Sequence, residues 1–139
     1  MPNSVEPLRR ILPAMCISLV LTFSGALANA ACLKDNTDGQ TVEGKLTIGR
    51  AKDAAGRPER PYILQLAAAA CLDSNDPDMA VKATRTIHVY PDDEKSVPVF
   101  ERLVGKLVTV SGNPFSAHTS HHHAPIVMRV SQIQPLTKR

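Results

Sequence analysis

Tryptophan is absent from this sequence of 139 residues, and other aromatic residues are scarce, with only two tyrosines and three phenylalanines. The formal net charge is only +3, and basic residues are mixed with acidic ones, as in Arg57-Pro58-Glu59-Arg60. Single-stranded nucleic acid is bound on aromatic stacking platforms, and duplexes are bound by basic stripes that neutralise phosphates. The scarcity of both features argues against nucleic-acid binding, and we expect no nucleic-acid partner.

Long uninterrupted hydrophobic runs are also missing. Arg9 and Arg10 precede an apolar stretch over residues 11–27, and small residues at Ala28 and Ala30 follow it. This order is typical of a secretory signal peptide, and we expect cleavage after Ala30. The apolar stretch is interrupted by polar and turn residues and falls short of the roughly 20 apolar residues of a membrane-spanning helix, so no stable membrane insertion is expected after cleavage.

Two other export routes match the sequence less well. The paired arginines suit a twin-arginine signal, but the residues around them do not. A lipoprotein signal would place an aliphatic residue three positions before Cys32, where this chain has Asn29. We therefore expect a Sec-type signal over residues 1–30 and one periplasmic or secreted domain over residues 31–139.

Cysteine is rare, with three residues in the chain. Removal of the signal peptide would discard Cys16 and leave Cys32 and Cys71, which do not form a C-x-x-C pair. An even pair in an oxidising compartment is expected to form a disulfide. By the chain-entropy relation, such a bridge would stabilise the fold by about 3 to 4 kcal/mol.

Apolar and polar residues alternate, or β-favouring residues cluster, in several short segments separated by turn-rich sequence. The segments predicted to be strands are residues 41–48, 62–72, 83–90, 106–112 and 126–133. Residues 49–61 form a long polar connection, and a short helix is expected between Ser96 and Gly105. Gln132 breaks the alternation of the last strand, which predicts a bulge there.

This order of elements, with a helix between the third and fourth strands, is the order of the OB-fold. The predicted fold is therefore a mainly all-β, five-stranded, OB-like Greek-key barrel. Ligands of this fold commonly contact the loop between the fourth and fifth strands. In this chain that loop contains four of the five histidines, namely His118, His121, His122 and His123.

Imidazole binds zinc and copper, so the histidine loop is a candidate metal site. In an extended segment His121 and His123 would point one way and His122 the other, while His118 and His121 could meet across a turn. No cysteine or nearby carboxylate completes a familiar structural-zinc spacing. Composition alone leaves two interpretations open: metal ligands, or side chains that shape the loop.

Catalysis has little support in the sequence. The serines and threonines beside the histidines lack the context of an activated nucleophile, and paired carboxylates are missing from the same segment. His88, on the third predicted strand, would join the loop histidines only if that face of the strand turned toward them. We expect a non-catalytic protein.

The segment His118-Thr119-Ser120-His121-His122-His123-Ala124-Pro125, with the strand before it, resembles an uncharacterised family of exported bacterial domains with an H-T-x-H-H-H-x-P pattern. Ser120 stands where that family usually has glycine, and the alanines of residues 67–70 replace larger side chains. The resemblance implies export and an OB-like barrel but no activity. The expectation is an exported binding or interaction module for an unknown protein or small molecule, with a periplasmic zinc or copper protein as the alternative.

Overall fold

The computed structural model describes residues 31–137. The predicted signal peptide over residues 1–30 lies outside this range. Within it, β-strands dominate and one short α-helix is present, as expected for a small OB-like barrel. None of the helices in the described part of the chain is long and apolar enough to cross a membrane.

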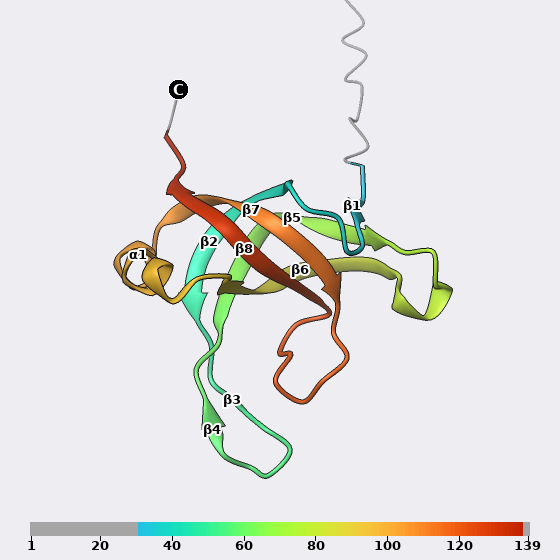
Figure 1. Cartoon of the computed structure of the whole chain (residues 1–139), viewed down its shortest axis with the longest axis horizontal. Helices are drawn as coiled ribbons and strands as arrows, with labels where there is room; N and C mark the ends of the chain where they lie inside the picture. Colours follow the sequence, from blue (N-terminus) through green and yellow to red (C-terminus); the bar gives the residue numbers. More distant parts are fainter. Residues whose placement is uncertain (1–30, 138–139) are drawn as a thin grey trace, which may run out of the picture.

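Five strands form the barrel (Figure 1). They are β2 (Gln40–Ile48), β5 (Tyr62–Asp73), β6 (Val81–Pro91), β7 (Leu107–Ser116) and β8 (Ile126–Pro135). They follow the order β5-β2-β7-β8-β6, and an antiparallel pairing of β5 with β6 closes the ring. The pairing of β6 with β8 is parallel, whereas β2 pairs antiparallel with both β5 and β7. The five-strand prediction is therefore confirmed, with β7 ending at Ser116 and β8 at Pro135, beyond the predicted ends at residues 112 and 133.

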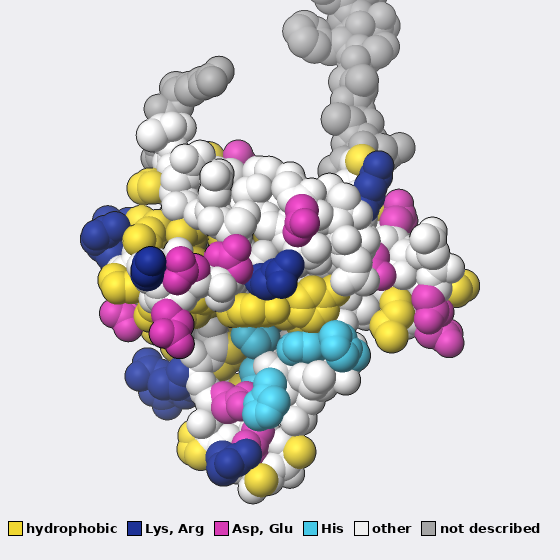
Figure 2. Space-filling view, in the orientation of Figure 1, with side chains coloured by type: hydrophobic (Ala, Val, Ile, Leu, Met, Phe, Trp, Pro, Cys, Tyr) yellow, Lys and Arg dark blue, Asp and Glu magenta, His cyan; other side chains and the backbone are white. Residues whose placement is uncertain are grey.

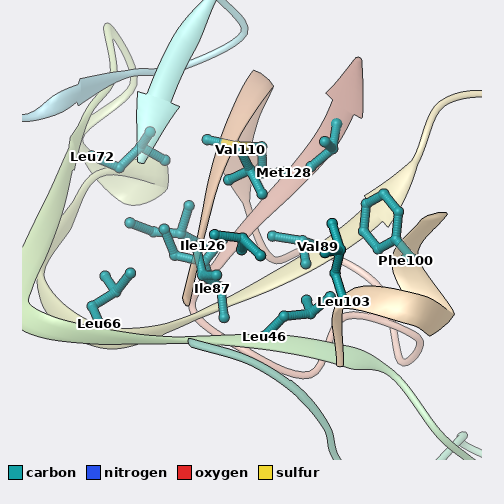
Figure 3. Packing of buried hydrophobic residues seen from close by; sticks show 13 residues of the cluster. Leu46, Leu66, Leu72, Ile87, Val89, Phe100, Leu103, Val110, Ile126 and Met128 are labelled. Atoms are coloured by element: carbon teal, nitrogen blue, oxygen red, sulfur yellow. The ribbon is translucent and has the colours of Figure 1, made fainter. Parts of the chain in front are cut away.

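The barrel interior is filled by aliphatic side chains that alternate along the strands (Figure 3). Fully buried members are Leu46, Leu64, Ile87, Val89, Val108, Val110, Ile126 and Met128. Each such side chain contributes about 1.5 to 3 kcal/mol of burial free energy, which makes this cluster the main stabilising feature.

The helix α1 (Val97–Leu103) closes one end of this interior. It buries Phe100 and Leu103, and the Phe100 ring packs 5.2 Å from that of Tyr62. Gly105 has a φ of 85°, a left-handed conformation that follows the helix and suits glycine. The 3₁₀ turns η1 (Pro77–Met79) and η2 (Glu94–Ser96) lie in the connections on either side of β6.

A bulge bends the pairing of β7 with β8. Ser111 pairs with Gln132 but Gly112 pairs with Val130, so Ser131 is the additional residue on β8. The predicted bulge is thus one position from Gln132. At Gly112 the strands approach so closely that a Cβ atom would lie 2.0 Å from the carbonyl oxygen of Arg129.

A disulfide joins Cys32 to Cys71, as predicted, with a Cα–Cα distance of 4.7 Å. It fastens the short strand β1 (Leu33–Lys34) to the end of β5, where Leu33 pairs with Leu72 in parallel. The N-terminal segment of the described chain is therefore tied covalently to the barrel.

The connection over residues 49–61 contains regular structure that the sequence analysis missed. β3 (Ala51–Lys52) and β4 (Pro58–Glu59) form a separate two-stranded hairpin. The hairpin and the loop between β7 and β8 both project from the same end of the barrel (Figure 1). Because both project from this end, the histidine loop lies next to the hairpin, whose residues are distant from it in sequence.

Candidate functional site

The carboxylate of Glu59 lies between two imidazoles of the histidine loop. His121 Nδ1 hydrogen bonds to Oε1 of Glu59, and His123 Nε2 hydrogen bonds to Oε2. The two contacts span 62 and 64 residues of sequence. One side chain of the hairpin is therefore held by two side chains of the loop.

The local conformation of the loop explains why these two histidines act together. The backbone N–H of His122 donates to the carbonyl of Thr119, forming a turn before the chain enters β8. His121 and His123 point toward Glu59, while His122 points back toward the start of the loop. His122 is thus separated from its two neighbours, in a loop that turns at residues 119–122 and is not the extended segment assumed in the sequence analysis.

The site is open on one side and enclosed on the other. The side chain of His123 is 13% exposed, that of Glu59 26% and that of His121 59%. Cyan histidine side chains and magenta acidic side chains meet on this face between the barrel and the hairpin (Figure 2). They border a pocket of about 250 Å³ lined by Glu59, Arg60, Pro61, His88, His121 and His123. A small solute or ion can therefore reach the imidazole and carboxylate atoms.

A second carboxylate, that of Asp53, lies beside the first. Asp53, Glu59 and His121 each offer one ligand atom, and these three atoms lie within 4.8 Å of one another. Asp53 also organises the turn of the hairpin, because its Oδ1 accepts from the N–H groups of Ala55 and Arg57, each at 2.9 Å. Its Oδ2 accepts from Arg57 Nε at 2.6 Å.

These contacts keep both carboxylates ionised. Hydrogen bonds from His123 and then His121 lower the pKa of Glu59. The backbone hydrogen bond from Arg57 is the largest cause that lowers the pKa of Asp53, and the charge of His121 adds to it. The site thus presents negative oxygen ligands next to imidazole nitrogens.

His88 packs against His123 and accepts a hydrogen bond from its backbone. Its Nδ1 accepts the backbone N–H of His123 at 3.2 Å, and the two rings are stacked with centroids 5.6 Å apart. Burial, followed by the charges of His123 and His122, lowers the pKa of His88 to about 4. His88 is therefore neutral with its proton on Nε2, which suits a positioning role better than a ligand role. The face of β6 that carries His88 therefore turns toward the histidine loop, which was the condition for His88 to join the loop histidines.

His118 and His122 form a separate pair next to Phe115. Nδ1 of His122 accepts from the backbone N–H groups of His118 and Thr119, at 3.1 and 3.3 Å. Nδ1 of His118 donates to the carbonyl of Ser116 at 2.9 Å, and the rings of His118 and His122 are 4.7 Å apart. Burial, with the charge of His118 second, lowers the pKa of His122. The turn brings His118 to His122 and not to His121, which corrects the alternative pairing suggested by the sequence.

Two site residues, Glu59 and Asp53, were missed because the sequence analysis searched for carboxylates near the histidines along the chain. The 49–61 connection carries no buried side chain in its two short strands that would mark a strand period, so its register, and with it the face of each carboxylate, could not be predicted from the sequence.

The fold and site together define a small OB-like barrel with a histidine and carboxylate cluster at one end. Residues 86–134 match the model of a domain of unknown function, DUF4431. The matched region runs from β6 to β8 and includes the entire histidine loop, but it does not include Glu59 or Asp53. None of the curated proteins compared with this chain matches it significantly.

Proposed function

We propose that this domain is a non-catalytic module that binds a divalent transition-metal ion, zinc or copper, in the exported space. His121, His123 and Glu59 are three protein ligands, and a carboxylate oxygen of Asp53 is the fourth. The observation that carries this proposal is the placement of the Glu59 carboxylate between two imidazoles, with a second carboxylate adjacent.

The donor set favours these ions over others. Zinc is commonly four-coordinate with imidazole nitrogen at about 2.0 to 2.1 Å and carboxylate oxygen at about 2.0 to 2.2 Å. Imidazole also suits copper, whereas calcium and magnesium prefer sites made of oxygen alone. Asp53, Glu59 and His121 offer ligand atoms within 4.8 Å of one another, and His123 contacts the second oxygen of the same Glu59 carboxylate. The exposure of His121 leaves a path for the ion to enter and leave.

Neighbouring residues hold the proposed ligand side chains in position before an ion binds. Stacking and a backbone hydrogen bond hold His123 against His88, and Arg57 fixes Asp53. Partners that orient metal ligands in this way typically affect affinity by 10- to 100-fold. The predicted signal peptide supports an exported location, where such a module would bind its ion outside the cytoplasm.

Isothermal calorimetry with zinc and then copper, at pH 7, tests the proposal on protein expressed from the full-length sequence. One ion should bind per chain with submicromolar affinity, and Glu59→Gln should weaken binding at least about 100-fold, since it removes a charged ligand. His118→Ala is the matched control, because it removes a histidine of the same loop that does not contact Glu59.

Two further results complete the test. Affinity should fall at pH 5.5, because protonated imidazole cannot act as a ligand. Absence of binding, or equal losses in Glu59→Gln and His118→Ala, would contradict the proposal and leave the cluster as a set of hydrogen bonds that shapes the loop.

A further inference from the structure

The β3–β4 hairpin has two chemically different faces. Ala51 pairs with Glu59, and Lys52 pairs with Pro58. Because directly opposed residues share a face and successive residues alternate, Glu59 lies on one face while Lys52 and Pro58 lie on the other. The face with Glu59 is the one that meets the histidines, so the opposite face is not used by the proposed metal site.

This second face gathers positive charge. The N–H of Gly49 donates to the carbonyl of Pro61 at 2.8 Å, which continues the hairpin register toward the barrel. The same register places Arg50 opposite Arg60, on the face that carries Lys52. All three cations are exposed, and within residues 31–137 none of them forms an ion pair.

Repulsion among these cations is screened by solvent, and a bound anion would relieve it further. Like charges directly opposite each other on a β-ribbon destabilise it. The only other basic residue of the hairpin, Arg57, is paired with Asp53 at 2.6 Å and is not available to a ligand. In Figure 2 dark-blue side chains gather beside the hairpin, on the side away from the histidines.

A pocket accompanies the charges. It has a volume of about 490 Å³ and is lined by Arg50, Ala51, Lys52, Pro58, Glu59 and Arg60. This volume lies within the roughly 300 to 1,000 Å³ of small-molecule sites. Pro58 gives it an apolar wall on the cationic face, whereas Ala51 and Glu59 border it from the other face, and the Glu59 carboxylate is engaged by His121 and His123.

We propose that this face of the hairpin binds a phosphate monoester with an apolar substituent. The two guanidinium groups can each offer a fork of N–H donors to phosphate oxygens, and Lys52 adds a point charge. A dianionic phosphate neutralises these cations better than a monoanionic carboxylate does. The apolar substituent packs on Pro58.

The test is a titration of the ¹⁵N-labelled, metal-depleted protein, expressed from the full-length sequence, with phenyl phosphate at low ionic strength. Saturable amide shifts should be confined to residues 49–61. Arg50→Gln combined with Lys52→Gln should raise the Kd at least about tenfold, since two charge-assisted contacts to the phosphate are lost. The matched control combines Lys82→Gln and Arg102→Gln, which removes the same charge from exposed positions on β6 and α1.

Non-saturating shifts, or an equal loss in the control variant, would overturn the proposal. Vesicles containing phosphatidic acid separate the two sources of such a group. Co-sedimentation that depends on Arg50 and Lys52 would identify a lipid headgroup, and its absence together with phenyl phosphate binding would identify a soluble ester.

The two proposed sites are neighbours, because Glu59 and Arg60 line both pockets, but substitutions at different residues test them separately. The Arg50 and Lys52 variant should keep its zinc affinity within about threefold, because neither residue lines the histidine pocket. Glu59→Gln should lose zinc but bind phenyl phosphate no more weakly, since it removes a negative charge. A failure of either proposal is therefore visible without affecting the other.

Discussion

Glu59 and His123 are 64 residues apart in the sequence, yet a hydrogen bond joins their side chains at one end of the barrel. This contact, with its counterpart from His121, is the link by which the hairpin and the histidine loop form one site. Its consequences extend to stability, loop order and pH dependence, and each can be measured.

His88 should make stability dependent on pH. Its folded pKa is about 4, below the ordinary value of 6.5, because it is partly buried near His122 and His123. The unfolded state therefore binds the proton first, so the free energy of unfolding should fall as pH decreases from 6.5 toward 4. Glu59 opposes this shift through its negative charge.

His88→Gln isolates this effect, because an amide oxygen can still accept the His123 N–H but does not titrate in this range. Between about pH 7.5 and pH 4.5 the wild type should lose about 1 to 2 kcal/mol more than the variant, after allowance for solvent screening. Urea denaturation of metal-free protein measures this difference. Parallel losses in both proteins would show that His88 is not the titrating group.

His122 should order the loop through its backbone hydrogen bonds. His122→Ala removes the acceptor for the N–H groups of His118 and Thr119. Amide hydrogen exchange at these two positions should accelerate at least about tenfold, as expected for loss of about 1.4 kcal/mol of local protection. Exchange in the core strand β7 serves as the internal reference. Unchanged exchange at both positions would mean that other contacts hold the loop.

Much of the fold could be predicted from the sequence because several strands alternate between buried and more exposed residues, as β7 does around Val108 and Val110. The break in this alternation at Gln132 likewise predicted a bulge within one position of the observed one. The hairpin could not be predicted, because β3 and β4 are two residues long and carry no buried side chain that would mark a period. Glu59 was missed for the same reason.

The arrangement of the loop histidines could likewise be predicted only in part from the sequence. The separation of His122 from His121 and His123 was expected for an extended segment, but the loop turns at residues 119–122 instead. Pairing of His118 with His122 depends on a turn closed by Thr119 and His122, and this turn has no proline or glycine to signal it. The position of His88 beneath His123 follows from the pairing of β6 with β8, a contact between distant parts of the chain.

Gly112 should be intolerant of substitution. A Cβ at this position would meet the backbone of Arg129 and Val130, which cannot rotate away as a side chain can. Gly112→Ala should therefore destabilise the barrel by at least about 2 kcal/mol. Gly49→Ala is a suitable control, since its Cβ would meet a movable side-chain atom of Ile63 at 3.1 Å. Equal thermal midpoints for the two variants would contradict this reasoning.

The disulfide should contribute substantially to stability. Replacing Cys32 and Cys71 together by alanine opens the cross-link between β1 and β5 and should cost about 2 to 4 kcal/mol in the free energy of unfolding. Denaturant titration measures the loss, and mass spectrometry of the wild type should find no free thiol on these two residues. An unchanged denaturation midpoint in the variant would show that β1 is held by its hydrogen bonds alone.

The most direct test of the metal-binding account is anomalous diffraction from crystals of the protein grown with zinc. The account predicts one strong anomalous peak bonded to Glu59, His121 and His123, and loss of that peak in Glu59→Gln. A peak on His118 and His122 instead, or none within bonding distance of Glu59, would contradict it.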